Sequence, residues 1–363
     1  MPLWQPTRRE IVATAPLLLG AAALPRPLVA VGNRGLKLFV IGDWGRNGAH
    51  YQKHVAGWMH NKAQQSGCDL IVSTGDNFYD YGVASSHDPQ WRTSYENIYS
   101  PELRRTPWFP VAGNHDWGGS MWAQLDRSGN GGWHMPWLWY DIPGARFGRP
   151  DVHLFFIDTL LWKGKEDKLF RLCGQAFREQ DVVQQKIWLA DALRASCAST
   201  KIVFGHHPIY VGGLDGGVMY LKSLDDVLIE AKVTAYICGH KHSLYHIKSD
   251  NLDYICSGGG STERPKDTRA IFQPACAAQG TCPPARMQQF VGRAGFAMVD
   301  VGTEAMTCSF VDRDGRVTPP QTIRSRGNHG MQCSGALPVD PAVLRERAQA
   351  RAKTFAPCAA VFG

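Results

Sequence analysis

Residue types that bind metal ions follow five short apolar segments of the chain. Each segment is rich in Val, Ile or Phe and is followed by a Gly, after which Asp, Asn or His appears. The segments with their polar residues are 36–41 with Asp43, 70–74 with Asp76, 108–112 with Asn114 and His115, 201–204 with His206 and His207, and 235–238 with His240 and His242. Carboxylate, amide and imidazole groups bind first-row divalent and trivalent metals. Two such ions, about 3.5–4 Å apart, would share a bridging carboxylate and have terminal ligands of their own.

A tyrosine close to one of these residues bears on the identity of the metal. Tyr79 stands three residues after Asp76, so it could reach the same ion from the following turn. Tyrosinate is a hard anionic oxygen donor, which favours Fe(III) over Zn(II) or Mg(II). The alternative is that Tyr79 is an ordinary core or rim aromatic residue.

The five apolar segments are typical of strands that are buried on both faces. Helical patterns separate them at 49–66, 178–198 and 218–231. Strand, helix and strand in this order indicate βαβ units with right-handed crossovers. The Gly after each strand allows the backbone to turn sharply, and ligands of such sheets bind beyond the carboxyl ends of the strands. We therefore expect the five sets of polar residues to meet at one place.

The remainder of the chain is richer in strands than in helices. The further predicted strands are 138–142, 152–158, 243–248, 252–256, 294–301, 305–312 and 316–323. Late strands without helices between them suggest a second, mixed sheet packed on the first, so the fold class is α/β. Two stretches, 159–175 and 258–290, are expected to be loops.

Composition excludes several classes of protein. The 363 residues are 44% hydrophobic and 20% charged, which is too apolar for a disordered chain. No apolar run of about 18 residues occurs, so no membrane-spanning helix is expected. The net charge of +7 is spread along the chain without a basic block, so nucleic acid is not expected as a partner.

The first thirty residues have the pattern of an export signal. Arg8 and Arg9 precede an apolar stretch that runs to Ala23, and a small residue, Ala30, stands at a suitable cleavage point. The arginine pair resembles the bacterial twin-arginine signal. An ordinary secretory signal or a starting helix with two chance arginines is the alternative. The expectation is a periplasmic or secreted bacterial protein that uses the twin-arginine export machinery.

Ten cysteines are many for a cytosolic enzyme and suit an exported protein. Cys276 could pair with Cys282, and Cys333 could pair with Cys358, although connectivity cannot be determined from sequence. Cys238 lies within a predicted buried strand and is expected to be a free thiol.

Five motifs in order along the chain identify a family. The motifs GDWG (42–45), GDNFY (75–79), GNHD (113–116), GHHP (205–208) and GHKH (239–242) resemble those of purple acid phosphatases. The similarity is greatest to the small, tartrate-resistant type and covers about residues 36–325. The resemblance implies a four-layer metallophosphoesterase (calcineurin-like) sandwich of two mixed β-sheets flanked by helices. The expected organisation is a signal at 1–30, a catalytic domain at 31–326 and a tail at 327–363.

The resemblance also implies how the metals are held. Fe(III) would be bound by Asp43, Tyr79 and His242, a divalent ion by Asn114, His206 and His240, and Asp76 would bridge the two ions. The divalent ion would be Fe(II), Zn(II) or Mn(II).

The same resemblance implies an acid phosphatase. A metal-bound hydroxide would attack the phosphorus of a phosphate monoester, while the metals neutralise charge on the phosphate oxygens. His115 would bind the phosphate or protonate the leaving group, and Asp116 would accept the other N–H of His115 and fix its orientation. Small phosphate monoesters are the expected substrates, with phosphoproteins or nucleotides as further candidates.

Two positions depart from the pattern of the family. His207 stands where the small-type members usually have Tyr, and we interpret it as a rim residue or a substrate contact. Asp215 falls near the position of a second, substrate-binding His. It could donate a proton if its pKa were raised, or it could be a turn residue. Trp44 and Phe78 are expected to pack beneath the metal ligands.

Two other functions remain as alternatives. A phosphodiesterase or protein phosphatase of the wider metallophosphoesterase class is one, and Tyr79 argues against it. A phosphate- or iron-binding protein with weak turnover is the other, and its support is Asp215 alone.

Overall fold

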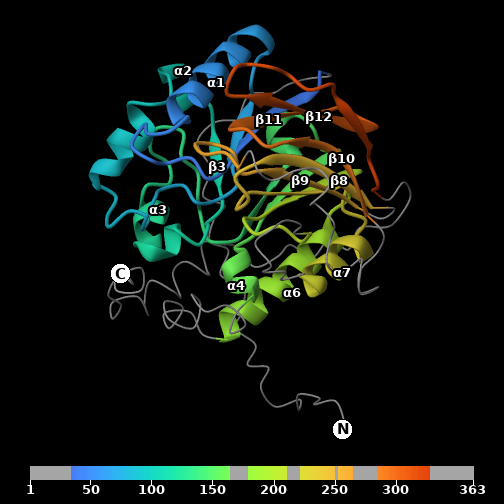
Figure 1. Ribbon diagram of the computed structural model, residues 1–363. Helices are drawn as coiled ribbons and strands as arrows, with labels where there is room; N and C mark the ends of the chain where they lie inside the picture. The colour runs from blue at the N-terminus through green and yellow to red at the C-terminus, as the bar shows by residue number, and fades with distance from the viewer. Residues whose placement is uncertain (1–33, 164–178, 211–220, 250–251, 265–284, 328–363) are drawn as a thin grey trace.

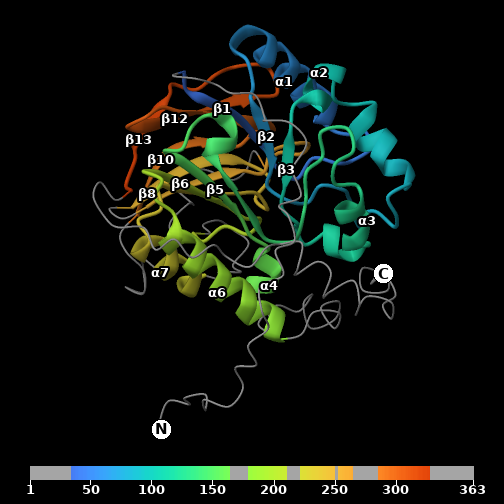
Figure 2. The same cartoon turned by 180° about the vertical axis from the view of Figure 1, so that it is seen from behind.

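Two mixed β-sheets face each other in the computed structural model, which describes residues 34–163, 179–210, 221–249, 252–264 and 285–327. Strand β11 of one sheet contacts β8 and β9 of the other. Helices α1 and α2 lie outside the first sheet, and α4, α6 and α7 lie outside the second (Figures 1 and 2). The four-layer α/β sandwich predicted from sequence is therefore confirmed.

The first sheet has six strands and carries three of the site loops. Its order is β13 (Gln321–Arg324), β12 (Ala305–Asp312), β11 (Gly295–Val301), β1 (Leu36–Ile41), β2 (Leu70–Ser73) and β3 (Trp108–Pro110). The last three strands are parallel to one another, and β11 is antiparallel to β1. Because β1, β2 and β3 are parallel, their carboxyl ends lie along one edge.

The second sheet has seven strands. Its order is β10 (Ala285–Val291), β8 (Leu244–Ser249), β9 (Asp253–Ser257), β7 (Ala235–Cys238), β6 (Thr200–Phe204), β5 (Val152–Phe156) and β4 (Tyr140–Pro143). Strands β5, β6, β7 and β9 are parallel, and the others join antiparallel at the two edges. Every residue of β6 and β7 is buried, as expected for parallel strands covered on both faces.

Helices and short helical turns connect these strands. The α-helices are α1 (Gln52–Ser66), α2 (Pro101–Arg105), α3 (Met121–Asp126), α4 (Thr159–Lys163), α6 (Glu179–Ala195) and α7 (Lys222–Glu230), and the shorter turns are η1 (Trp91–Glu96), η2 (Asp116–Gly118) and η3 (Gly144–Phe147). Helix α2 shows why such a short element forms. The Ser100 side chain accepts a hydrogen bond from Leu103 N, and Pro101 occupies the first helical position.

The placement of the strands corrects one expectation. The five strands that precede the site residues do not share a sheet, because β6 and β7 belong to the second sheet. The late strands are divided as well, with β11–β13 in the first sheet and β8–β10 in the second. A short apolar run specifies a strand that is buried on both faces, but it does not specify its neighbours, since strand pairing is non-local.

Local details also differ from the sequence predictions. A loop was expected from residue 159, but Thr159–Lys163 form α4, because Oδ1 of Asp158 accepts hydrogen bonds from Leu160 N and Leu161 N and caps the helix. The predicted strand at 316–323 begins only at Gln321. Oδ1 of Asp312 holds a turn there by accepting hydrogen bonds from Asp314 N and Arg316 N.

Large aromatic side chains fill the space beneath the first sheet's carboxyl edge. The Trp44 ring packs against Phe78 at a centroid distance of 5.4 Å and is fully buried, as is Phe78. The indole Nε1 of Trp44 donates to Ser73 Oγ at 2.8 Å. The prediction that these two residues pack beneath the ligand loops is confirmed, and Cys238 is a buried free thiol as predicted.

Several predictions lie outside the described residues. They concern the signal at 1–30, Asp215, most of the tail at 327–363 and the proposed pairs of Cys276 with Cys282 and Cys333 with Cys358. Among the helices in the described part of the chain, none has the length and apolar character needed to cross a bilayer.

Candidate metal centre

Donor atoms of seven side chains converge beside the carboxyl ends of β1, β2, β3, β6 and β7. They form two sets that share one carboxylate. The tyrosine cluster consists of Asp43, Asp76, Tyr79 and His242, and the imidazole cluster consists of Asp76, Asn114, His206 and His240. The structure thus brings together all seven residues that the sequence suggested as metal ligands.

The tyrosine cluster is rich in anionic oxygen donors. The Tyr79 hydroxyl lies 3.0 Å from Oδ1 of Asp43, 2.9 Å from Oδ2 of Asp76 and 3.2 Å from Nε2 of His242. Nε2 of His242 is 3.4 Å from Oδ1 of Asp43. Two carboxylates and a phenol oxygen are hard donors, which suit a highly charged metal ion.

The imidazole cluster has mostly neutral donors. Oδ1 of Asn114 lies 3.1 Å from Nε2 of His206 and 3.0 Å from Nδ1 of His240. These two ring nitrogens are 3.3 Å apart, and Nε2 of His206 is 3.4 Å from Oδ2 of Asp76. Two imidazoles, an amide and one carboxylate suit a divalent ion such as Zn(II), Fe(II) or Mn(II).

Oδ2 of Asp76 belongs to both clusters, since it faces Tyr79 on one side and His206 on the other. Atoms bound to one metal at about 2.0–2.2 Å must lie roughly 3 Å from each other, which is the spacing found within each cluster. The donor set therefore fits two metal ions bridged by Asp76.

Backbone N–H groups of neighbouring loops hold the two carboxylates in place. Oδ2 of Asp43 accepts from His240 N, and Oδ1 of Asp76 accepts from His115 N, each at 2.8 Å. Each aspartate thus uses one oxygen to join two loops and presents the other to a cluster. Asp43, Asp76 and His240 also have positive φ angles of 61°, 50° and 67°. Such conformations cost about 1–3 kcal/mol each and are typical of functional sites.

Two of the glycines before the site residues allow other loops to approach closely. A Cβ on Gly113 would lie 2.2 Å from Oδ1 of Asp76, and one on Gly239 would lie 2.7 Å from Oδ2 of Asp43. Neither glycine has a positive φ. At these two positions close packing requires the glycine, and the residue that adopts the left-handed conformation after Gly239 is His240 itself, whereas Gly75, before Asp76, has a φ of 90°.

Hydrogen bonds on the far side of two imidazoles orient them. Nδ1 of His206 donates to the carbonyl of Thr74 at 2.8 Å, so the lone pair of Nε2 faces the cluster. Nδ1 of His242 lies 2.8 Å from Oγ1 of Thr262. Such partners fix the tautomer and the direction of a metal-binding histidine. Thr262 was not singled out from sequence, although it follows closely on a run of three glycines, 258–260.

Electrostatic coupling within the centre is strong. Burial opposes the ionised form of Asp76, but the imidazoles of His206, His115 and His240 together outweigh burial and hold the pKa of Asp76 well below its usual range. Burial and the neighbouring carboxylates of Asp43 and Asp76 raise the pKa of the Tyr79 phenol well above its ordinary value, while Arg46 acts in the opposite direction. A cation placed between these groups would relieve the repulsion among the carboxylates and the phenolate.

His115 lies at the open side of the centre. Its side chain is 29% exposed, and Nε2 is 4.0 Å from Oδ2 of Asp76. Nδ1 lies 2.6 Å from the carbonyl oxygen of Asp80, so it is the protonated nitrogen. The hydrogen bond that was expected from His115 to Asp116 is not formed.

Asp116 instead holds the loops beneath the centre. Its buried carboxylate accepts hydrogen bonds from Asn77 N, Gly113 N and Nε2 of Gln124. Burial and the nearby charge of Asp76 raise the pKa of Asp116 to about 6. The residue therefore fixes the positions of the loops that carry Asp76 and Asn114, and its neighbour His115 is oriented by backbone.

His207 is buried beside His206 and His240, with a ring nitrogen within 4.8 Å of theirs, so the interpretation as a rim residue is wrong. Its ring lies 4.6 Å from that of His240, and Nδ1 is 2.8 Å from Oγ1 of Thr159 at the start of α4. Burial and the adjacent imidazoles of His240 and His206 hold the pKa of His207 well below its usual range.

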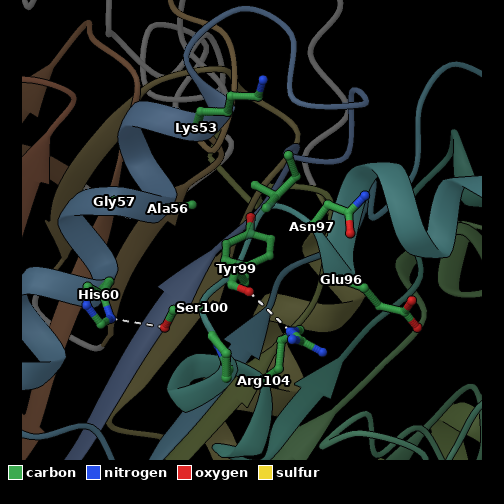
Figure 3. Close-up of a pocket in the computed structure, with 11 residues that line it drawn as sticks. Lys53, Ala56, Gly57, His60, Glu96, Asn97, Tyr99, Ser100 and Arg104 are labelled. Atoms are coloured by element: carbon green, nitrogen blue, oxygen red, sulfur yellow. Dashed lines mark hydrogen bonds between the residues drawn. The ribbon is translucent and has the colours of Figure 1, made fainter.

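A groove of about 340 Å³ between α1 and the segment 96–104 is separate from the metal centre, since none of its lining residues is a ligand. Figure 3 shows His60 directed at Ser100 across this groove, with Nδ1 3.0 Å from Oγ. Arg104 Nε donates to the carbonyl of Tyr99 at 3.2 Å. The contact of His60 with Ser100 ties the start of α2 to α1, which indicates a structural function.

Comparisons with known proteins agree with this geometry. The family model of the calcineurin-like phosphoesterases matches residues 36–244. Purple acid phosphatase 3 of Arabidopsis thaliana is 36% identical over 62% of this chain and 63% of its own length, a little under two thirds. The human tartrate-resistant acid phosphatase type 5 is 31% identical over 84% of this chain and 95% of its own.

A solved structure has a similar fold. The Plasmodium protein GAP50, described as the anchor in the inner membrane complex, superposes with a TM-score of 0.66 at 23% identity and covers 88% of this chain and 95% of its own. The chain therefore belongs to the calcineurin-like phosphoesterase family and, within it, to the purple acid phosphatases, which are acid phosphatases with a binuclear metal centre.

Proposed function

We propose that this protein is an exported acid phosphatase that hydrolyses phosphate monoesters at a dinuclear centre of Fe(III) and a divalent metal. The observation that carries the proposal is the shared Oδ2 of Asp76, with the Tyr79 hydroxyl 2.9 Å away on one side and Nε2 of His206 3.4 Å away on the other. A bridging carboxylate between unlike donor sets suits two metals of different charge.

The donor chemistry assigns an ion to each cluster. Asp43, Tyr79 and His242 would hold Fe(III), because hard anionic oxygens favour a trivalent ion. Asn114, His206 and His240 would hold Fe(II), Zn(II) or Mn(II). When bound, the two ions supply positive charge for the phosphate oxygens and lower the pKa of water enough to provide a nucleophile in acid.

His115 is placed to handle the proton of the leaving group. Its Nδ1–H is fixed by the Asp80 carbonyl, and Nε2 faces the carboxylate of Asp76 from the exposed side of the centre. A protonated Nε2 could therefore donate to the alkoxide as the ester bond breaks. Asp116 has a positioning role, since its carboxylate binds the backbone of the loops that carry Asp76 and Asn114.

The proposed substrates are small phosphate monoesters, with phosphoproteins or nucleotides as further candidates. The exposed edges of His115 and His242, with side chains 29% and 18% exposed, mark the side from which a phosphate would enter. Asp215, which lies outside the described residues, is proposed as a second proton donor. An Asp215→Asn variant with an unchanged pH profile would contradict that role.

One sample can test the metal assignment. Metal analysis, a visible spectrum and a pH profile with p-nitrophenyl phosphate are measured on the wild type and on Tyr79→Phe. We expect at least one iron and two metals in all per chain, a purple charge-transfer band and an acidic optimum in the wild type, and no band in Tyr79→Phe. Tyr81→Phe is the matched control, because Tyr81 is exposed and only two residues away. A colourless wild type with two bound metals and full activity would overturn the Fe(III)–tyrosinate assignment.

Export through the twin-arginine machinery is part of the proposal. Its support is the Arg8–Arg9 pair before an apolar stretch that runs to Ala23, with Ala30 at a suitable cleavage point. This route carries folded proteins, which suits a metal centre assembled before export. Replacing both arginines by lysine should retain the protein in the cytoplasm of a bacterial host, and continued appearance in the periplasm would contradict this route.

A further inference from the structure

A cation lies on the ring face of the tyrosine in the tyrosine cluster. The guanidinium carbon of Arg46 is 3.5 Å from the centroid of the Tyr79 ring. This is a close cation–π distance, since favourable contacts extend to about 6 Å. The hydroxyl of the same tyrosine lies between the carboxylates of Asp43 and Asp76, so Arg46 faces the one ring whose oxygen is directed into the metal centre.

Several contacts fix Arg46 in this position. The Arg46 side chain is only 18% exposed, and Nη1 is 3.3 Å from Oδ1 of Asp80, the residue after Tyr79. Its backbone N–H donates to Oε1 of Gln52 at 3.1 Å, and the carbonyl of Gly45 accepts from Tyr79 N at 2.8 Å. The loop after β1 and the loop after β2 are therefore joined where Arg46 meets Tyr79.

The guanidinium is held mainly by the ring. Nε of Arg46 is buried and makes no hydrogen bond within the described part of the chain. Asp80, its ionic partner, has a side chain that is 66% exposed, and such pairs are weak in water. A planar guanidinium stacks well on an aromatic face, which explains why this arrangement is retained without a full set of hydrogen bonds.

We propose that Arg46 is a positioning residue that tunes the metal bound at the tyrosine cluster by placing a positive charge on the face of the Tyr79 ligand. The proposal rests on the proposed Fe(III)–tyrosinate centre. A nearby positive charge stabilises electron density on a phenolate, so the phenolate gives less of it to the metal. The same charge favours the reduced, less positive state of the metal.

Two consequences follow for a purple centre. Charge transfer moves an electron from the phenolate ring to Fe(III) and leaves a positive hole on the ring. The Arg46 charge raises the energy of that transition, so removing the charge should shift the band to longer wavelength. Removing it should also lower the reduction potential of the iron, because the reduced state loses a stabilising cation.

The experiment compares the full-length, metal-loaded wild type with Arg46→Gln and Arg46→Lys. For each protein, iron content, the maximum of the visible band and the reduction potential are measured. We expect full iron content in all three, a longer-wavelength band and a lower potential in Arg46→Gln, and Arg46→Lys closer to the wild type. Arg313→Gln is the matched control, because Arg313 lies 3.9 Å from the ring of Tyr51, which is not a ligand.

The possible results separate this proposal from the proposed function. A purple wild type with an unshifted band and potential in Arg46→Gln would overturn the role of Arg46 and leave the metal assignment intact. Equal shifts in Arg46→Gln and Arg46→Lys would also overturn it, because they would reflect lost packing of the ring instead of lost charge. A colourless iron-loaded wild type would reject the tyrosinate assignment and, with it, this inference.

Discussion

The two halves of the metal centre differ in charge although they share a ligand. The tyrosine cluster adds a carboxylate, a phenol oxygen and one imidazole to Asp76, whereas the imidazole cluster adds two imidazoles and an amide. Similar donor spacing with unequal charge gives each position a preference for a different metal ion. The comparison teaches that donor type, more than spacing, distinguishes the two positions.

The supports of the two clusters differ as well. On the imidazole side, His206 is oriented by the backbone carbonyl of Thr74. On the tyrosine side, His242 contacts the Thr262 side chain and Tyr79 lies beneath the Arg46 side chain. Side-chain supports can be changed by mutation one at a time, so the tyrosine cluster is the half whose properties can be adjusted most easily.

The strongest test of the comparison removes the shared ligand. Asp76→Asn replaces a bridging carboxylate by an amide, and kcat/KM should fall on the order of 10³-fold or more, because transition-state stabilisation and metal binding are lost together. Metal analysis should show loss at both positions. Asp226→Asn, an exposed aspartate on α7 that pairs with Lys222, is the control. Full metal content and activity in Asp76→Asn would contradict the shared-ligand geometry.

Chelation should separate the two clusters. Because the imidazole cluster has mainly neutral donors, dialysis against a chelator should remove the divalent ion first. We expect loss of about one metal per chain and of most of the activity, a retained visible band, and recovery on adding Zn(II), Mn(II) or Fe(II). If the colour disappears before the activity does, the assignment of the two metals is reversed.

A substitution of His115 should slow the cleavage of the ester bond without changing the binding of either metal ion. His115→Gln should lower kcat about 100-fold, the usual contribution of a general acid, while metal content and the visible band stay at wild-type levels. Kinetics on a substrate with a good leaving group should show a smaller loss. An equal loss for good and poor leaving groups would argue against proton donation by His115.

The smallest expected effect concerns the support of His242. Thr262→Val removes the hydroxyl 2.8 Å from Nδ1 of His242, and iron retention should weaken about tenfold, as for other partners of metal-binding histidines. Thr262→Ser keeps the hydroxyl and should behave like the wild type. A valine variant that releases iron no faster than the wild type would show that the support does not matter.

Much of the fold could be predicted from local patterns. The strands at 36–41 and 235–238 have the predicted bounds. An apolar run this short that ends at a Gly can bury all its side chains as a strand between two layers, whereas it is too short for a buried helix. The short helix at Thr159–Lys163 shows the limits, since its start depends on hydrogen bonds to the side chain of Asp158, whereas the helix predicted from residue 49 begins only at Gln52. The assignment of β6 and β7 to the second sheet had no local signal.

The sequence by itself determined which side chains stand at the ends of which strands and which family the motifs resemble. Tertiary structure alone decided that the ends of strands from two sheets meet and that Oδ2 of Asp76 faces both clusters. It also decided that Asp116 binds the loops beneath the centre and not the ring of His115. The contact of Arg46 with the ring of Tyr79 was likewise a matter of tertiary structure. The physical reason is that residue type and spacing act over a few residues, whereas these contacts join segments far apart in the chain. Their geometry is fixed only when the two sheets pack together.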